Sequence, residues 1–316
     1  GARPIGPASG EYVAYPTTST ILAAAKLTGR TSSGTSIGLL SAVTDRESAR
    51  SVEGDVLRTT RVTPRTAYGL GRVQQEFGRS ASTVSVMGTF VGRDLQPDNP
   101  LAAFLPSRAI GLGSDAVVRL KGGEYEATFL GLMSLVSGSE AAIERLQRAP
   151  AHYFQRPDRV YSRIDRTRTS MNGYKAIAGF ERRSGRHWLW DTEITAISPG
   201  LETNDIGRTL SGDGLRHIFT LRYRETQPGT LLRAYTLGFN VNNEWTYDKD
   251  HIVRLFRPSV ALTFKNFWAL SAVVSRNLRV LDPALTRGGP LMQRPASWTA
   301  TASLTNAAAS PSSTSE

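Results

Sequence analysis

The sequence contains no cysteine and no long apolar run. Without cysteine the chain has no disulfide, no thiolate metal ligand and no cysteine nucleophile. The longest apolar segments, such as Ile21–Ala25, are about five residues long, far short of the roughly 18 that indicate a membrane-spanning helix. A membrane β-barrel is not excluded, since its strands are apolar on one face only. The lack of cysteine also agrees with export to an oxidising compartment.

The charge is strongly positive, at +11 over 316 residues. The basic residues are spread singly and in pairs from Arg3 to Arg294 instead of forming a block. Such scattering is typical of a solvated face and not of a patch that binds phosphates. We therefore expect no nucleic-acid partner, although a soluble β protein that binds a polyanion stays open as an alternative.

Hydrophobicity alternates with a period of two. In the segment 215–224, Leu215, Phe219, Leu221 and Tyr223 share one face while arginines occupy the other. The segments 231–244 and 268–277 repeat this pattern, which predicts β-strands and not packed helices. These segments have about 9–14 residues, whereas strands of soluble proteins have about five or six. About 9–11 residues cross a membrane at a tilt, so strand length favours a transmembrane barrel.

The connections between the expected strands alternate between short and long. Short turns are expected at 32–34, 78–80, 121–123, 184–186, 227–229 and 265–266, and longer polar connections at 45–62, 94–108, 138–168, 198–214 and 278–296, with a shorter one at 245–250. Outer-membrane barrels have short periplasmic turns and long external loops. A soluble sandwich gives no reason for its two ends to differ so regularly.

Aromatic residues gather near the short turns. They are Phe77, Tyr125, Phe180, Trp188, Tyr223, Phe264, Phe267 and Trp268. Rings of this kind prefer the interface between a membrane and water. The pattern indicates an aromatic girdle at one membrane surface, and aromatics that merely flank hairpin turns are the alternative.

One long connection differs from the others. Ser139 is suited to cap a short helix over Ala141–Arg148, with Glu140 in its first turn and Pro150 ending it. The segment His152–Asp158 follows and mixes aromatic with charged groups. Either an external loop folded over or into the barrel mouth or an ordinary ordered surface loop fits this composition.

The predicted fold is therefore an all-β, antiparallel transmembrane β-barrel with one short helix in a long loop. About 12–13 strands are visible, and we interpret them as part of a larger barrel, because the first strand, at about 19–31, must run downward and bacterial barrels start from the periplasm. The expected organisation is a lead-in segment at 1–18, a partial barrel at 19–306 and a Ser/Ala-rich tail at 307–316.

Several stretches resemble an uncharacterised bacterial family, the domain of unknown function 5916. The stretches are Thr20–Gly29, Ser36–Thr44, Tyr153–Asp158, Ser198–Gly207, Phe264–Trp268 and Arg287–Pro295. Members usually follow an amino-terminal domain similar to family 9 carbohydrate-binding modules. The resemblance implies an outer-membrane barrel and supplies no established activity or catalytic residues.

Nothing in the sequence indicates a catalytic centre, a metal site or a cofactor. The four histidines have no metal-binding spacing, and each is expected at a surface or an interface. Glycosidases need two carboxylates across a cleft. Asp191 and Glu193 share one strand face, and Glu202 and Asp205 share a loop, but ion pairing with arginines is the simpler role for the first two.

The polar face of the strands carries the functional prediction. Residues expected to face inward are Arg72, Glu76, Arg119, Lys175, Asp191, Glu193, Arg216, Arg222, Arg224, Asn240, Asn242 and Glu244. Some of these strand residues and four residues of the loop segment are the candidate lumen or binding residues. They are Tyr153, Gln155, Arg156, Asp158, Asp191, Glu193, Arg216, Arg222, Arg224, Asn240 and Asn242.

We expect a pore, transport or anchoring protein of the bacterial outer membrane, inserted by the barrel-assembly machinery and surrounded by outer-membrane lipid. An Arg-rich lumen favours an anionic solute. A carbohydrate solute is implied only by the carbohydrate-binding-like domain that usually precedes this family. An outer-membrane carbohydrate-active hydrolase or carbohydrate-binding protein is the alternative.

Overall fold

The chain folds around one large antiparallel sheet. The structure is a computed structural model, and it describes residues 8–96, 99–203 and 213–306. The sheet has 13 strands, and the described residues hold one α-helix. This confirms the predicted all-β, antiparallel class and a strand number within the predicted range.

The strands of the large sheet are 10 to 14 residues long. In sheet order they are β18 (Ser297–Asn306), β15 (Trp268–Asn277), β14 (His251–Phe264), β13 (Leu232–Trp245), β12 (Gly214–Glu225), β11 (Trp188–Ile197), β10 (Ser170–Arg182), β9 (Tyr125–Ser137), β8 (Arg108–Leu120), β7 (Ser82–Arg93), β6 (Thr66–Phe77), β3 (Thr35–Thr44) and β2 (Ile21–Arg30). Each strand pairs with its neighbours along the chain once the small inserted strands are passed over, so the sheet is a meander.

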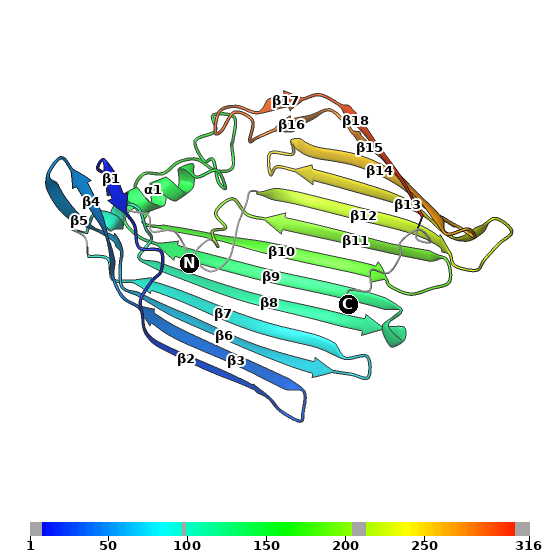
Figure 1. Cartoon of the computed structure of the whole chain (residues 1–316), viewed down its shortest axis with the longest axis horizontal. Coiled ribbons are helices and arrows are strands. Elements are labelled where there is room, and N and C mark those ends of the chain that lie inside the picture. Colours follow the sequence, from blue (N-terminus) through cyan, green and yellow to red (C-terminus); the bar gives the residue numbers. More distant parts are fainter. Residues whose placement is uncertain (1–7, 97–98, 204–212, 307–316) are drawn as a thin grey trace, which may run out of the picture.

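The two ends of the sheet are built differently. The sheet curves into an open trough, with the short turns at one end and the long connections at the other (Figure 1). Among the short turns, Gly34 and Gly78 adopt φ angles of 86° and 69°, a left-handed conformation that glycine tolerates without strain. The alternation of short and long connections expected from the sequence is therefore present.

Two of the long connections contain strands of their own. β4 (Glu47–Glu53) and β5 (Val56–Thr63) form a hairpin that also pairs with β1 (Tyr12–Ala14), in the segment expected to be a lead-in. β16 (Val280–Asp282) pairs with β17 (Met292–Arg294). The sequence analysis expected long polar connections at these places and did not single out the small strands, which bury few side chains, such as Ala49, Ser51 and Val62.

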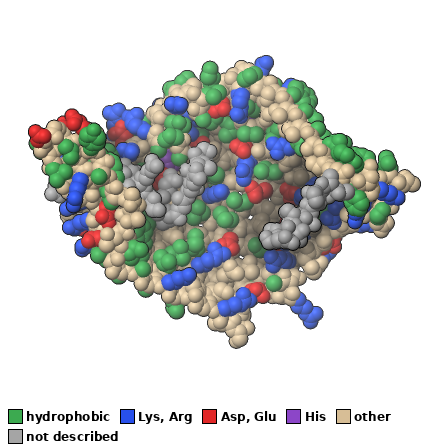
Figure 2. Space-filling model, viewed as in Figure 1, with side chains coloured by type: hydrophobic (Ala, Val, Ile, Leu, Met, Phe, Trp, Pro, Cys, Tyr) green, Lys and Arg blue, Asp and Glu red, His purple; other side chains and the backbone are tan. Residues whose placement is uncertain are grey.

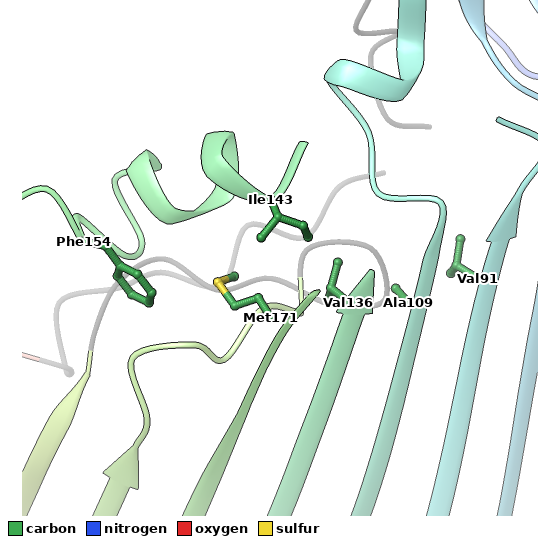
Figure 3. Close-up of a cluster of buried hydrophobic side chains, with 6 residues drawn as sticks. All are labelled: Val91, Ala109, Val136, Ile143, Phe154 and Met171. Atoms are coloured by element: carbon green, nitrogen blue, oxygen red, sulfur yellow. The ribbon is translucent and has the colours of Figure 1, made fainter. Parts of the chain in front are cut away.

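The connection between β9 and β10, residues 138–169, folds back over the sheet, and we call it the covering loop. It contains α1 (Glu140–Arg148), which begins where the sequence predicts: the Ser139 hydroxyl accepts a hydrogen bond from the Ala142 N–H at 3.2 Å. Figure 3 shows Ile143 of α1 above Val136, Ala109 and Val91 at the strand ends, with Phe154 and Met171 completing the cluster. The covering loop therefore packs against the strand ends of the sheet.

The large sheet is open at both edges in the described part of the chain. β2 and β18 each pair on one side only, and the tail at 307–316 lies outside the described residues. Among the described residues, no helix has the length and apolar composition needed to span a membrane.

Candidate functional site

The register divides the large sheet into two unlike faces. Residues that pair across strands lie on the same face, so the pairs of Leu112 with Met133 and of Met133 with Tyr174 extend one face across three strands. This outer face is apolar and uncovered: Met133, Leu112 and Ile194 are 63%, 58% and 56% exposed. The charged residues that the strand pairing places on the outer face lie near the ends of their strands. They are Arg108, Arg182, Glu225, Arg254 and Arg276.

Aromatic rings form a belt on the outer face near the short turns. Tyr125 stacks on Phe180 with ring centroids 6.1 Å apart, and Phe180 meets Trp190 at 5.3 Å. Farther along, Trp188 meets Tyr223 at 5.0 Å. The belt contains several of the aromatics that the sequence placed near these turns.

The opposite face, which the covering loop partly overlies, is polar, and we call it the inner face. The register places on it every strand residue that the sequence analysis expected to face inward, from Arg72 on β6 to Glu244 on β13. Basic and acidic side chains are interspersed over the hollowed face in the space-filling view (Figure 2). The inner face therefore combines charge of both signs with access to solvent.

Four of the inner-face carboxylates are paired with arginines. Arg216 Nη2 lies 2.9 Å from Glu193 Oε1, and Arg222 Nη2 lies 3.0 Å from Asp191 Oδ1. Arg72 with Asp115 and Arg119 with Glu126 continue the series at 2.9 and 3.0 Å. Asp191 and Glu193 are thus accounted for as ion-pair partners, and Asp205 lies outside the described residues.

The remaining polar candidates of the sheet make hydrogen bonds to uncharged groups or to the neighbouring Glu244. Asn240 donates to Thr220 Oγ1 at 3.0 Å, and Asn242 donates to Glu244 Oε1 at 3.5 Å. Arg224 donates to the Gly185 carbonyl at 3.3 Å, close to a short turn. These three side chains have different partners and do not converge on one point of the inner face.

The covering loop is tied to the connection between β15 and β18. Asp158 Oδ2 accepts a hydrogen bond from the Leu291 N–H at 2.6 Å, and Asp158 Oδ1 lies 3.3 Å from Arg156 Nε. Gly288, with φ 101°, packs so closely on Gln155 that a Cβ there would lie 2.2 Å from Gln155 Nε2. Two segments far apart in the sequence are therefore locked together.

This tie should depend on pH. Although burial opposes the shift, the Leu291 N–H and the Arg156 guanidinium lower the pKa of Asp158 below its ordinary 3.8. A lowered folded-state pKa means that the contribution is present above pH 3.8 and is lost as pH falls through the folded-state value. We expect the hydrogen-exchange protection of the Leu291 amide, corrected for intrinsic rates, to hold at pH 6 and to fall below pH 4. Asp158→Asn should flatten this profile; an unchanged profile would contradict the assignment.

A buried polar network lies under the covering loop. His152 Nδ1 lies 2.8 Å from the Pro199 carbonyl, and His152 Nε2 lies 3.1 Å from Glu202 Oε2, with His152 only 3% exposed. The expectation of a surface or interface histidine was wrong for His152. A carbonyl only accepts hydrogen bonds, so Nδ1 carries a proton, and a further proton is shared between Nε2 and the Glu202 carboxylate.

A second buried pair lies beside the first. Arg159 Nη2 lies 3.0 Å from Asp213 Oδ2, and the Tyr161 hydroxyl donates to the same Asp213 oxygen at 2.6 Å. Burial, reinforced by the Asp213 charge, raises the pKa of Tyr161, so the hydroxyl stays protonated and remains a donor. Arg159 also donates to the His152 carbonyl at 2.6 Å, which joins the two pairs into one network.

A cavity of about 520 Å³ lies between the covering loop and the inner face. It brings together the predicted residues Tyr153, Arg156 and Arg216 with Arg159 and Asp213, which the sequence analysis did not single out. Arg222, Asp191, Asn240 and Asn242 are not part of its lining. No group of three or more potential metal ligands occurs in the described part of the chain.

Comparison with known proteins adds one family. A family model described as "Domain of unknown function (DUF5916)" matches residues 5–102 and 136–282. No curated protein matches the chain. The match spans most of the large sheet and the covering loop, and it carries no described activity.

Proposed function

The chain belongs to the family of the domain of unknown function 5916, and we propose that its large sheet is the wall of a bacterial outer-membrane β-barrel whose lumen passes or binds anionic solutes. The apolar outer face carries this proposal. Soluble proteins rarely expose contiguous apolar patches above a few hundred Å². A face that stays apolar across all 13 strands is accounted for if lipid covers it.

The dimensions of the sheet support the same placement. Strands of 10–14 residues are long enough to cross the hydrocarbon layer at a tilt. The ring contacts of Tyr125, Phe180 and Trp188 fit the headgroup level at the short-turn side. The charged residues of the outer face lie near strand ends, where lipid-facing charge costs least.

The inner face supports the solute class. Its ion pairs leave Lys175 without an ion-pair partner among the described residues, and the chain as a whole carries a charge of +11. Positive potential in a confined channel raises the local concentration of anions. The covering loop lies at the end of the sheet where the long connections are found (Figure 1), so in a closed barrel it would narrow the lumen there.

The experiment is outer-membrane fractionation of the full-length protein, followed by gel migration of the detergent extract with and without boiling. We expect the protein in the outer membrane, with a heat-dependent shift. Reconstituted in bilayers, it should conduct anions in preference to cations. A protein that stays in solution and does not shift would overturn the barrel, and cation-selective conductance would overturn the solute class.

A further inference from the structure

The covering loop carries a second cavity, lined by four arginines. They are Arg148, Arg156, Arg163 and Arg166, with Phe154, Gln155, Pro157 and Ile164 completing the wall. The cavity has a volume of about 470 Å³, within the range of ligand pockets. Among the residues that the structure describes, no carboxylate belongs to its lining. We call it the arginine cavity.

The positive charge of this cavity is only partly balanced. Glu144 is shared by two arginines, with Oε1 2.8 Å from Arg148 Nη2 and 3.4 Å from Arg166 Nε. Asp158 faces Arg156, and within the described chain Arg163 has no ion-pair partner. Four guanidinium groups thus share two carboxylates, and both carboxylates lie outside the lining.

Arg156 supplies an independent observation. Its side chain is only 2% exposed, and Nη1 is buried without a hydrogen-bond partner among the described residues. A buried guanidinium N–H left unpaired is costly, and native proteins usually satisfy such groups.

We propose that the arginine cavity binds the oxyanion group of a hydroxylated organic solute, a carboxylate, sulfate or phosphate ester. Guanidinium groups match such oxygens with paired hydrogen bonds. Gln155 Oε1 is also buried without a partner in the described part of the chain, and it is suited to accept from a ligand hydroxyl. Because Arg156 also lines the cavity above the inner face, the bound group lies one side chain away from the proposed lumen. The site deepens the proposed anion preference and rests on it.

The test is calorimetric titration of the full chain in detergent with hexose 6-phosphate, hexuronate, inorganic phosphate and a neutral hexose. We expect saturable binding of the two organic oxyanions, weaker binding of inorganic phosphate and none of the hexose. Arg163→Met should weaken binding of hexose 6-phosphate about tenfold or more, since it removes a charged donor. Arg163 is exposed, so this variant should fold; Arg156→Met should weaken binding at least as much.

Arg168→Met is the matched control. Arg168 lies in the same loop and pairs with Asp165 at 3.3 Å, but it does not line the arginine cavity. We expect the affinity of the Arg168→Met variant for hexose 6-phosphate to stay within twofold of that of the unmodified protein. An equal loss in Arg168→Met would mean diffuse charge and would overturn the site, as would the absence of saturable binding or equal affinity for the neutral hexose. Inorganic phosphate binding as tightly as its hexose ester would overturn the hydroxylated class.

The heat-dependent gel shift of the same preparation separates this site from the barrel. A heat-dependent gel shift without oxyanion binding would refute the proposed binding site in the arginine cavity and would still support the barrel. Oxyanion binding without a heat-dependent gel shift would refute the barrel and would still support the binding site in the arginine cavity.

Discussion

An arginine in place of Ala272 should destabilise the protein in lipid by about 2–4 kcal/mol, the cost of lipid-facing Arg near the membrane midplane. Ala272 lies near the middle of β15, and the register pairs it with Val260 and Ala302 on the outer face. If lipid covers this face, the guanidinium must stay desolvated or distort the bilayer. The measurement is denaturant unfolding of the full-length protein in lipid vesicles.

Ser271 offers a control in the adjacent position. It is similar in size to Ala272, but it faces inward and pairs with Ala261 and Ser303, which are small and uncharged. Ser271→Arg should cost about 1 kcal/mol or less, because Ser271 is exposed and the variant loses only its side-chain hydrogen bond to the Ser303 hydroxyl at 2.7 Å. If the sheet were instead surrounded by water on both faces, the two arginines would cost equally little. Equal effects would therefore refute the lipid-facing assignment.

The large sheet could be predicted from the sequence because its strands are marked by alternation within short segments and pair with strands that are adjacent in the chain. Alternation in the segments 215–224 and 268–277 fixes which side chains share a face, and pairing between neighbours along the chain then fixes the rest. Trp268–Asn277 forms a strand with the expected bounds. The small strands β4 and β16 were not predicted, because they bury few apolar side chains and therefore show no extended alternation of apolar and polar residues.

The candidate site was predictable only in part. The inward-facing residues follow from strand alternation, and Arg156 was singled out within a loop segment. The two buried pairs were not predicted. His152 contacts Glu202, 50 residues away in the sequence, and Arg159 contacts Asp213, which lies in the same connection as Glu202. Loop segments carry no periodicity that would indicate which of them fold over the sheet, so these contacts depend on tertiary structure.

The second large effect concerns how the covering loop is held. Replacing His152 by alanine should weaken docking of this loop by about 3 kcal/mol, because it leaves two buried hydrogen-bonding groups, the Pro199 carbonyl and the Glu202 carboxyl group, without their partner. The imidazole contacts the Pro199 carbonyl and the Glu202 carboxylate, and Glu202 is 4% exposed. The measurement is hydrogen exchange of the Phe154 amide, which donates to Gln147 O within the loop. Its protection should fall about 100-fold, because local opening sets the exchange rate.

Glu202→Gln separates the shared proton from simple packing. A glutamine amide has nearly the shape of the carboxylate, and its N–H can donate to Nε2 while a neutral imidazole still donates from Nδ1 to the Pro199 carbonyl. Both ring nitrogens then keep partners without a shared proton. We therefore expect Glu202→Gln to lower Phe154 protection far less than His152→Ala, and the double variant to cost less than the sum of the two. Equal losses in the two single variants would contradict this hydrogen-bond assignment, because a pair held only by opposite charges loses as much when either charge is removed.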